Sequence, residues 1–242
     1  MTGLTIIIPA LNEAKALPAL ARNIGALHPP PQAVLVIDGG SEDETVSIAE
    51  GLGLTVVHQT PAGRAHQINR GVEAAETELV CVLHADTRLP LDAVRVITET
   101  LEDKSVALSG FTAVLAGEDT TRWGTTLHNW AKTWYAPLIF RPHLFFRGCR
   151  LLFGDHAMFF RKQDFLDVGG CDPEMMVMED ADMCVKFTAK GRVRLINRIV
   201  ETSDRRVAAW GGLRANWIYF KVAMQWAFGA RKRLGDQYPD IR

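Results

Sequence analysis

The first part of the chain alternates between two hydrophobic periods, and this alternation constrains the fold more than any other feature. Short runs rich in β-branched residues recur as LTIIIP, AVLVID, LTVVHQ and ELVCVLH, and stretches with helical spacing separate them. Strand and helix in alternation build βαβ units, whose strands are parallel and whose helices cover both faces of the sheet. Ser41 followed by Glu44 is typical of a capping box and predicts where the second helix begins. The sequence therefore predicts an α/β fold with a mostly parallel central sheet.

After Pro90 the pattern continues less regularly. SVALSGFTAVLA predicts a strand, and DHAMFFRKQDFLDVGG predicts a strand and then a short helix that Gly169 and Gly170 end. EDADMCVKFTAKG predicts a short helix closed by Gly191. The chain finishes in an amphipathic pattern over residues 210–233, which predicts a C-terminal helix.

Two apolar segments leave alternatives open. Residues 120–150 are rich in aromatic side chains, which usually pack in a core, so we expect them to build the core of the second half. A groove that binds a substrate is the alternative. For the C-terminal helix, packing on its own domain or on a second copy of the chain is favoured over contact with an anionic membrane.

Charge, cysteine spacing and hydropathy exclude several classes of protein. The net charge of −1 argues against a nucleic-acid binder, which normally carries a basic excess. The four cysteines are scattered without a C-x-x-C pair, which predicts neither a zinc site nor a disulfide framework. No basic region precedes the first apolar run, and no stretch of about 18 uncharged apolar residues occurs. We therefore expect a cytoplasmic protein, with peripheral membrane contact left open.

Polar side chains follow the first, second and fourth predicted strands. Asn12 and Glu13 follow the first strand, Asp38 ends the second, and His84 and Asp86 follow the fourth. Ligands of open parallel sheets bind outside the carboxyl ends of the strands, so we expect these side chains to face one crevice. Neither G-x-G-x-x-G nor a P-loop follows the first strand, so a glycine-wrapped pyrophosphate is not indicated.

A second group of carboxylates lies in MEDADMCVKF. Glu179, Asp180 and Asp182 crowd the first turn of a predicted helix, where acids also compensate the helix dipole. Neighbouring carboxylates repel one another, and this repulsion raises the pKa of at least one of them. A carboxylate of raised pKa suits a general base that takes the proton of a hydroxyl group.

A series of motifs resembles, in the same order, the family 2 glycosyltransferases, which have the GT-A fold. The motifs are TIIIPALNEA, VIDGGSEDET, GRAHQINRG, LHADTRLP, GDHAMFFRKQDFLDVGG and MEDADMCVKF. Within the family, the chain is similar to small soluble bacterial-type members with LHADT and a later arginine pair. The resemblance implies a Rossmann-like GT-A domain over residues 1–205, with a nucleotide-sugar-binding half (1–115) and an acceptor half (116–205). Residues 206–242 would form a C-terminal helical extension.

The resemblance also implies a donor site that depends on a divalent metal. HAD stands where many members have Asp-x-Asp, so Asp86 and His84 are the implied ligands of Mn²⁺ or Mg²⁺, and an imidazole ligand favours Mn²⁺. A histidine bonded to backbone or phosphate is the alternative for His84. Asp38 is implied to read the base of a nucleoside-diphosphate sugar. The implied donor-binding residues are Pro9, Leu11, Glu13, Asp38, Arg64, Ala85, Arg205 and Arg206.

By the same resemblance, Asp180 is the general base and Glu179 positions the acceptor in an inverting, hexosyltransferase-type reaction. The acceptor hydroxyl belongs to a small metabolite, a lipid or a glycan. Asp155 and His156 are candidate substrate contacts. Two other functions stay open: a non-catalytic nucleotide-sugar binding module, in which the acids near Asp180 only cap a helix, and a membrane-surface partner protein built around the C-terminal helix. That helix is also the candidate for a homodimer contact.

Overall fold

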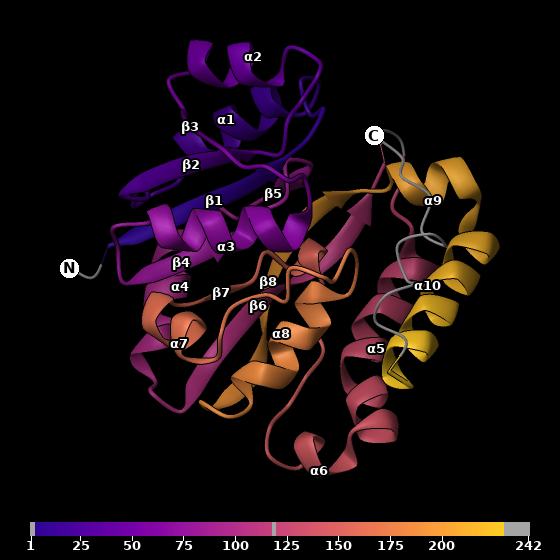
Figure 1. Cartoon of the computed structure of the whole chain (residues 1–242). Coiled ribbons are helices and arrows are strands. Elements are labelled where there is room, and N and C mark those ends of the chain that lie inside the picture. The colour runs from indigo at the N-terminus through magenta and orange to yellow at the C-terminus, as the bar shows by residue number, and fades with distance from the viewer. Residues whose placement is uncertain (1–2, 118–119, 230–242) are drawn as a thin grey trace.

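The computed structural model describes residues 3–117 and 120–229, and in these residues the strands form one sheet flanked by helices (Figure 1). The described strands follow the order β3-β2-β1-β4-β7-β6-β8-β5. Their bounds are β1 Leu4–Ala10, β2 Ala33–Asp38, β3 Thr55–His58, β4 Leu79–Val82, β5 Thr87–Arg88, β6 Val106–Ala116, β7 Phe159–Arg161 and β8 Arg192–Ser203. The helices are α1 Leu17–Gly25, α2 Thr45–Gly51, α3 Arg64–Ala74, α4 Ala93–Glu102, α5 Trp123–Phe140, α6 Pro142–Phe145, η1 Gly154–His156, α7 Lys162–Asp167, α8 Glu179–Phe187, α9 Arg205–Trp210 and α10 Gly212–Ala227.

The first four strands pair in parallel, as the sequence predicts. Strand β1 pairs with β2 and β4, and β2 pairs with β3, all in parallel register. Successive side chains of β1 point to opposite faces of the sheet, so Ile7 packs with α3 while Ile6 and Ile8 pack with α1 and α4. Both faces of the sheet are therefore buried under helices, which confirms the predicted α/β class.

The second half adds strands of both directions. Strand β7 lies between β4 and β6 and is antiparallel to both, whereas β8 runs parallel to β6 and antiparallel to β5. The predicted strand-then-helix segment is present as β7 and α7, and Gly169 and Gly170 end it with left-handed φ values of 82° and 65°. These strands bring α8 and the loop before it to the carboxyl ends of β1 and β4.

The predicted capping box is wrong. Helix α2 begins at Thr45, and Glu44 flanks it without a side-chain cap. The hydroxyl of Ser41 instead accepts a hydrogen bond from the backbone N–H of Asn12, at 2.9 Å. Ser41 is thus used to join the loops that follow β1 and β2, and this contact between distant segments overrides the local motif.

The prediction that the aromatic segment builds a core is wrong for much of α5. The helix turns Thr125, Thr133 and Ala136 inward, while Trp123 and Trp134 are exposed. Aromatic content alone does not reveal which face of a helix packs, because that depends on where the small side chains lie relative to the sheet.

Helices α9 and α10 follow the last strand, and α10 lies beside α5 (Figure 1). Helix α10 buries Val222 and Trp226 against the rest of the chain, so packing on its own domain is observed. Its outward side is also apolar, and the predicted amphipathic pattern stays a prediction. Residues 230–233 of that pattern lie outside the described residues. Within the described part of the chain, none of the helices combines the length and apolarity needed to cross a bilayer.

Candidate active site

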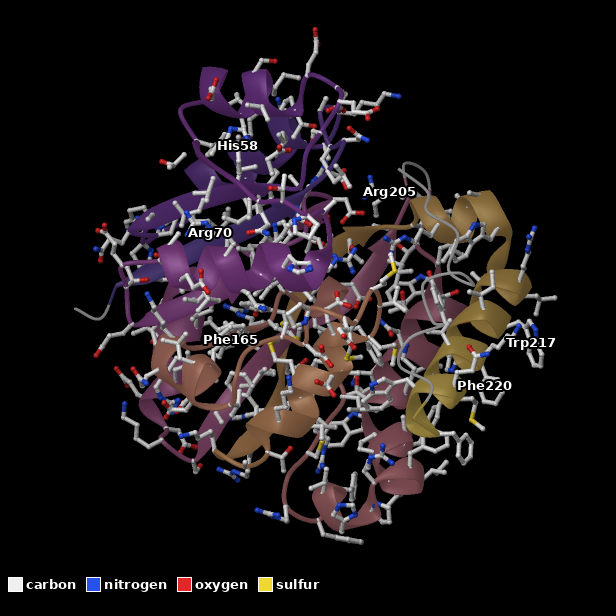
Figure 2. The ribbon with its side chains drawn as sticks, in the orientation of Figure 1. His58, Arg70, Phe165, Arg205, Trp217 and Phe220 are labelled. Carbon is white, nitrogen blue, oxygen red and sulfur yellow. The ribbon has the colours of Figure 1, made fainter. Side chains whose placement is uncertain are left out.

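A cavity of about 670 Å³ lies where the carboxyl ends of β1 and β4 meet segments from the second half of the chain. Figure 2 shows one of its residues, Arg205, at the junction between the N-terminal part of the sheet and the C-terminal helices. The predicted site residues that line the cavity are Pro9, Leu11, Glu13, Arg64, His84, Ala85, Asp86, Glu179, Asp180, Arg205 and Arg206.

Asp38 is a predicted donor-binding residue that does not line the cavity. It is buried, and its carboxylate accepts hydrogen bonds from the backbone N–H groups of Gly40 and Ser41, both at 3.1 Å. Its Oδ2 also lies 3.5 Å from Nδ1 of His58. Burial raises the pKa of Asp38, but these hydrogen bonds outweigh burial and lower it. The observed contacts give Asp38 a role in ordering the β2–α2 loop, and the reading of a base stays a prediction.

Arg205 connects the two carboxylates that follow β1 and β4. Its guanidinium binds both oxygens of Glu13, at 2.7 and 3.0 Å, and its Nε lies 3.2 Å from Oδ2 of Asp86. A planar guanidinium suits this forked geometry. Burial raises the pKa of Asp86, Arg205 opposes this shift and Glu13 adds to it, so the net pKa is raised. The start of α9 is therefore held against the loops that follow β1 and β4.

His84 presents a neutral imidazole to the cavity. Burial lowers its pKa well below the ordinary value, and the charges of Arg64, Arg206 and Arg205 lower it further. Its buried Nε2 has no hydrogen-bond partner among the described residues. The ring lies against the backbone of Gly154, where an added Cβ would overlap the imidazole atoms Cε1 and Nε2. The imidazole therefore fits here only because residue 154 is a glycine and has no side chain.

The side-chain atoms that could ligate a metal here suit a divalent cation that also binds a phosphate group. Asp86 offers carboxylate oxygens and His84 offers a neutral nitrogen that has no hydrogen-bond partner in the described part of the chain, and both line the same cavity. Among residues 3–117 and 120–229, the structure has no group of three or more His, Cys, Asp or Glu side chains that could enclose a metal. Magnesium-like cations often keep only one or two protein ligands and complete their shell with phosphate and water. The residues thus fit a cation that arrives with a diphosphate and do not fit an all-protein cage.

The chain enters α8 through a left-handed residue. Met178, which flanks the helix, has a φ of 68°, a conformation that costs a side chain about 1 kcal/mol or more. The first helical residues, Glu179 and Asp180, then line the cavity. Oε1 of Glu179 lies 3.5 Å from the guanidinium of Arg64, which opens α3. The Arg64–Glu179 pair places two charged side chains from opposite halves of the chain against each other.

Asp180 is a buried carboxylate that is well placed to accept a proton. Its oxygens accept hydrogen bonds from the backbone N–H groups of Gly154 and Ala181, each at 2.7 Å. Burial and the neighbouring Glu179 raise its pKa to about 7, while Arg64 and the backbone hydrogen bonds oppose this rise. A carboxylate with a pKa of about 7 is a suitable general base at neutral pH. Gly154 thus contacts both His84, through its Cα side, and Asp180, through its N–H.

Helix α5 contributes cavity residues that the sequence did not reveal, Lys132, His128 and Asn129. The ammonium of Lys132 stands 3.6 Å from the centre of the Phe153 ring. Burial lowers the pKa of Lys132, and the charges of Asp155 and Asp180 oppose this shift. A single lysine in an aromatic helix carries no motif, so only the three-dimensional packing identifies it.

The predicted pair Asp155 and His156 divides between two environments. Asp155 lines the cavity and accepts a hydrogen bond of 2.6 Å from the side-chain amide of Asn129. His156 is buried, does not line the cavity, and has its Nδ1 2.8 Å from the carbonyl oxygen of Phe111. Asp155 remains a candidate substrate contact, whereas His156 is part of the packing beside β6.

The chain is similar to known proteins over much of its length. The model of the family described as "Glycosyl transferase family 2" matches residues 5–169. An uncharacterized glycosyltransferase from Mycobacterium tuberculosis (strain ATCC 25618 / H37Rv) is 29% identical over 131 residues, which cover 53% of this chain and 58% of the relative. A 4,4'-diaponeurosporenoate glycosyltransferase from Staphylococcus aureus (strain USA300) is 38% identical over 102 residues, which cover 39% of this chain and 27% of the relative. The match thus spans little more than half of the mycobacterial relative and about a quarter of the staphylococcal one.

A solved structure supports the fold over nearly the whole chain. The mannosyltransferase from Pyrobaculum calidifontis in complex with GDP-Man and Mn²⁺ aligns with a TM-score of 0.71 at 20% identity, covering 96% of this chain and 64% of that one. The fold is therefore the GT-A fold of glycosyltransferases, and the family match extends over most of it. The chain belongs to glycosyl transferase family 2.

Proposed function

We propose that this glycosyltransferase moves a sugar from a nucleoside-diphosphate sugar to an acceptor hydroxyl with inversion, and that Asp180 is its general base. The observation that carries the proposal is the position of Asp180. It is a buried carboxylate with a pKa of about 7 and lines the same cavity as Asp86 and His84. A hexosyltransferase-type reaction on a small metabolite, a lipid or a glycan is part of the proposal.

The donor end of the cavity has the charges that a diphosphate needs. Arg64, Arg205 and Arg206 line it, and a guanidinium binds phosphate oxygens in a forked geometry. Asp86 and His84 would hold Mn²⁺ or Mg²⁺, which when bound supplies positive charge against the departing diphosphate. Because Arg205 contacts Asp86 and Glu13, its position is set before the donor arrives.

At the acceptor end, Asp180 takes the proton of the attacking hydroxyl. The hydroxyl oxygen forms a bond to the anomeric carbon, and the bond from that carbon to the diphosphate oxygen breaks. The products are a glycoside, a nucleoside diphosphate and a protonated Asp180. Attack from the side opposite the leaving group inverts the anomeric centre. Glu179 pairs with Arg64 next to the base and positions the acceptor.

The names of the similar proteins support this proposal in outline. The staphylococcal relative is named a glycosyltransferase, and the archaeal structure contains a nucleotide-sugar with Mn²⁺. We extend the donor class and the metal to this chain. The division at residues 115 and 205, with a C-terminal extension from residue 206, and a cytoplasmic location are also parts of the proposal.

Calorimetric titration of nucleoside diphosphates and nucleotide-sugars, with and without Mn²⁺, tests the donor site. Wild type is expected to bind one nucleotide type in a Mn²⁺-dependent way, and Asp86→Ala to lose that dependence. Asp103→Ala is the matched control, because Asp103 is exposed and lies away from the cavity. Binding that is equally strong without Mn²⁺, or unchanged in Asp86→Ala, would show that HAD is not a metal motif in this chain.

A further inference from the structure

Helix α5 carries an exposed apolar stripe along its outward side. Its members follow one another at steps of three or four residues, which places them on one helix face. Trp123 at the start of the stripe is 69% exposed. The exposed members are Trp123, Leu127, Trp130, Trp134 and Leu138.

Helix α10 repeats this pattern. Its exposed apolar residues follow the same spacing, and Figure 2 shows Trp217 and Phe220 pointing away from the rest of the molecule. Trp217 is 65% exposed, although α10 already buries Val222 and Trp226 on its other side. The exposed members are Leu213, Trp217 and Phe220, and Phe228 follows the end of the helix.

The two helices contact each other, and their exposed apolar stripes are here named together the α5–α10 face. Nδ1 of His128 in α5 lies 3.0 Å from Oδ1 of Asn216 in α10. Further along, Arg141 donates to the carbonyl oxygen of Ala227 at 3.4 Å. Both outward stripes therefore belong to neighbouring helices that run side by side (Figure 1).

The charged side chains of α5 and α10 are all cations. Helices α5 and α10 contain one lysine, one arginine and one further lysine between them (Lys132, Arg214 and Lys221) and neither Asp nor Glu. The whole chain has a net charge of −1, so its acidic residues are concentrated elsewhere. Arg214 and Lys221 of α10 are exposed, whereas Lys132 of α5 lines the cavity.

We propose that the α5–α10 face docks on a membrane that contains anionic lipid. Exposed tryptophans with flanking cations suit the boundary between headgroups and acyl chains. Each Lys or Arg near an anionic surface adds about 1 kcal/mol to such binding. A second copy of the chain is a poorer occupant, because two faces with only positive charges would repel each other.

Docking through this face also places the cavity beside the membrane. His128 and Lys132 of α5, and Asn216 and Tyr219 of α10, line the cavity. A lipid-borne acceptor would then reach the site from the bilayer. This consequence rests on the proposed function, whereas the docking itself does not.

Co-sedimentation of the full chain with vesicles tests the proposal. Wild type is expected to bind vesicles of phosphatidylcholine with added phosphatidylglycerol, to bind phosphatidylcholine alone much more weakly, and to be released by salt. The double variant Trp217→Ser/Phe220→Ser and the single variant Lys221→Glu should each weaken binding about tenfold or more. Leu91→Ser, a change at an exposed leucine away from this face, should bind like wild type.

Circular dichroism and nucleotide binding confirm that the variants are folded, because Trp217, Phe220 and Lys221 do not line the cavity. Absence of binding to anionic vesicles would overturn the proposal, and so would wild-type binding by the double variant. Sedimentation equilibrium tests the alternative occupant of the face, a second copy of the chain. A dimer that Trp217→Ser/Phe220→Ser separates into monomers, without vesicle binding by wild type, would show that the face is an interface between two copies.

Discussion

At the scale of single residues, Asp180 and His84 have opposite pKa shifts with a common cause. Burial disfavours the charged form of each group, so the pKa of the carboxyl rises and that of the imidazole falls. At neutral pH the site therefore holds a carboxylate that can accept a proton and an imidazole nitrogen that can accept a metal. Both states are those that the proposed transfer needs.

The pKa of Asp180 predicts the pH dependence of activity. A base must be deprotonated, and the pKa of about 7 in the free protein means that this form is lost as pH falls through that value. We expect kcat/KM to rise with pH up to about 7 and then to level off. A steady-state pH profile measures this. A flat profile from pH 5 to pH 8 would contradict the assignment of Asp180.

Gly154 is predicted to be intolerant of any side chain. In Gly154→Ala the new methyl group would overlap the His84 ring, and the N–H that Asp180 accepts would shift with it. We expect Mn²⁺-dependent nucleotide binding to weaken about tenfold or more and turnover to fall further. Turnover falls further because a shift of about 1 Å in the position of reacting groups can lower the rate about 10²-fold. Gly25→Ala is the control, because nothing lies within 4 Å of its added Cβ. Nucleotide binding by Gly154→Ala at wild-type strength would contradict this account of His84.

At the scale of elements, the ends of β1 and β2 are joined by one side chain of α3. Nε2 of the buried Gln67 donates to the carbonyl oxygens of Ala10 and Ile37, at 2.6 and 2.7 Å. These carbonyls lie near the carboxyl ends of two parallel strands, and Ala10 and Gln67 also line the cavity. Gln67 therefore fixes the strand ends from which the β1–α1 and β2–α2 loops begin.

Gln67→Leu is predicted to destabilise the fold. The change removes both hydrogen bonds, although the carbonyl oxygen of Ala10 still accepts one from the backbone N–H of Gly39 at 2.9 Å. Each hydrogen bond lost costs about 0.5–1.5 kcal/mol. Urea unfolding, with the midpoint converted to a free energy, measures the effect. Gln163→Leu, at an exposed glutamine of α7, should stay within about 0.5 kcal/mol of wild type. Equal stability of the two variants would refute the role of Gln67.

The sequence predicts elements well where hydrophobic period decides them and poorly where long-range pairing does. The β-branched runs of β1, β2 and β4 lead directly to the parallel sheet and to the position of Glu13 and Asp86 at its edge. The antiparallel insertion of β7 between β4 and β6 has no local signal, because strand order depends on contacts between distant segments. The same limit applies to Lys132, whose position in the cavity depends on how α5 crosses β6.

At the scale of the whole molecule, the cavity joins both halves of the chain. Arg205 of α9 reaches Glu13 after β1, and Arg64 of α3 reaches Glu179 of α8. A ligand bound here contacts segments that are far apart in sequence. Its binding energy therefore contributes to the stability of the whole fold.

Nucleotide with Mn²⁺ is accordingly predicted to raise the unfolding temperature of the whole chain. At about 100 times its Kd, a ligand that binds only the folded state stabilises it by about 2.7 kcal/mol. We expect a single, shifted thermal transition by calorimetry, and a much smaller shift in Asp86→Ala. A ligand-induced shift of the same size in Asp86→Ala would argue against a metal-assisted donor site.

Turnover by Asp180→Asn tests the central claim most directly. Release of nucleoside diphosphate from the bound nucleotide-sugar is measured beside the Kd of the donor, with Asp182→Asn as the matched control, because Asp182 lies in the same helix and pairs with Lys186 outside the cavity. If Asp180 is the general base, Asp180→Asn should lower turnover about 10²- to 10⁴-fold and leave the Kd of the donor unchanged. Wild-type turnover in Asp180→Asn, or donor binding without any turnover in the wild type, would contradict the claim.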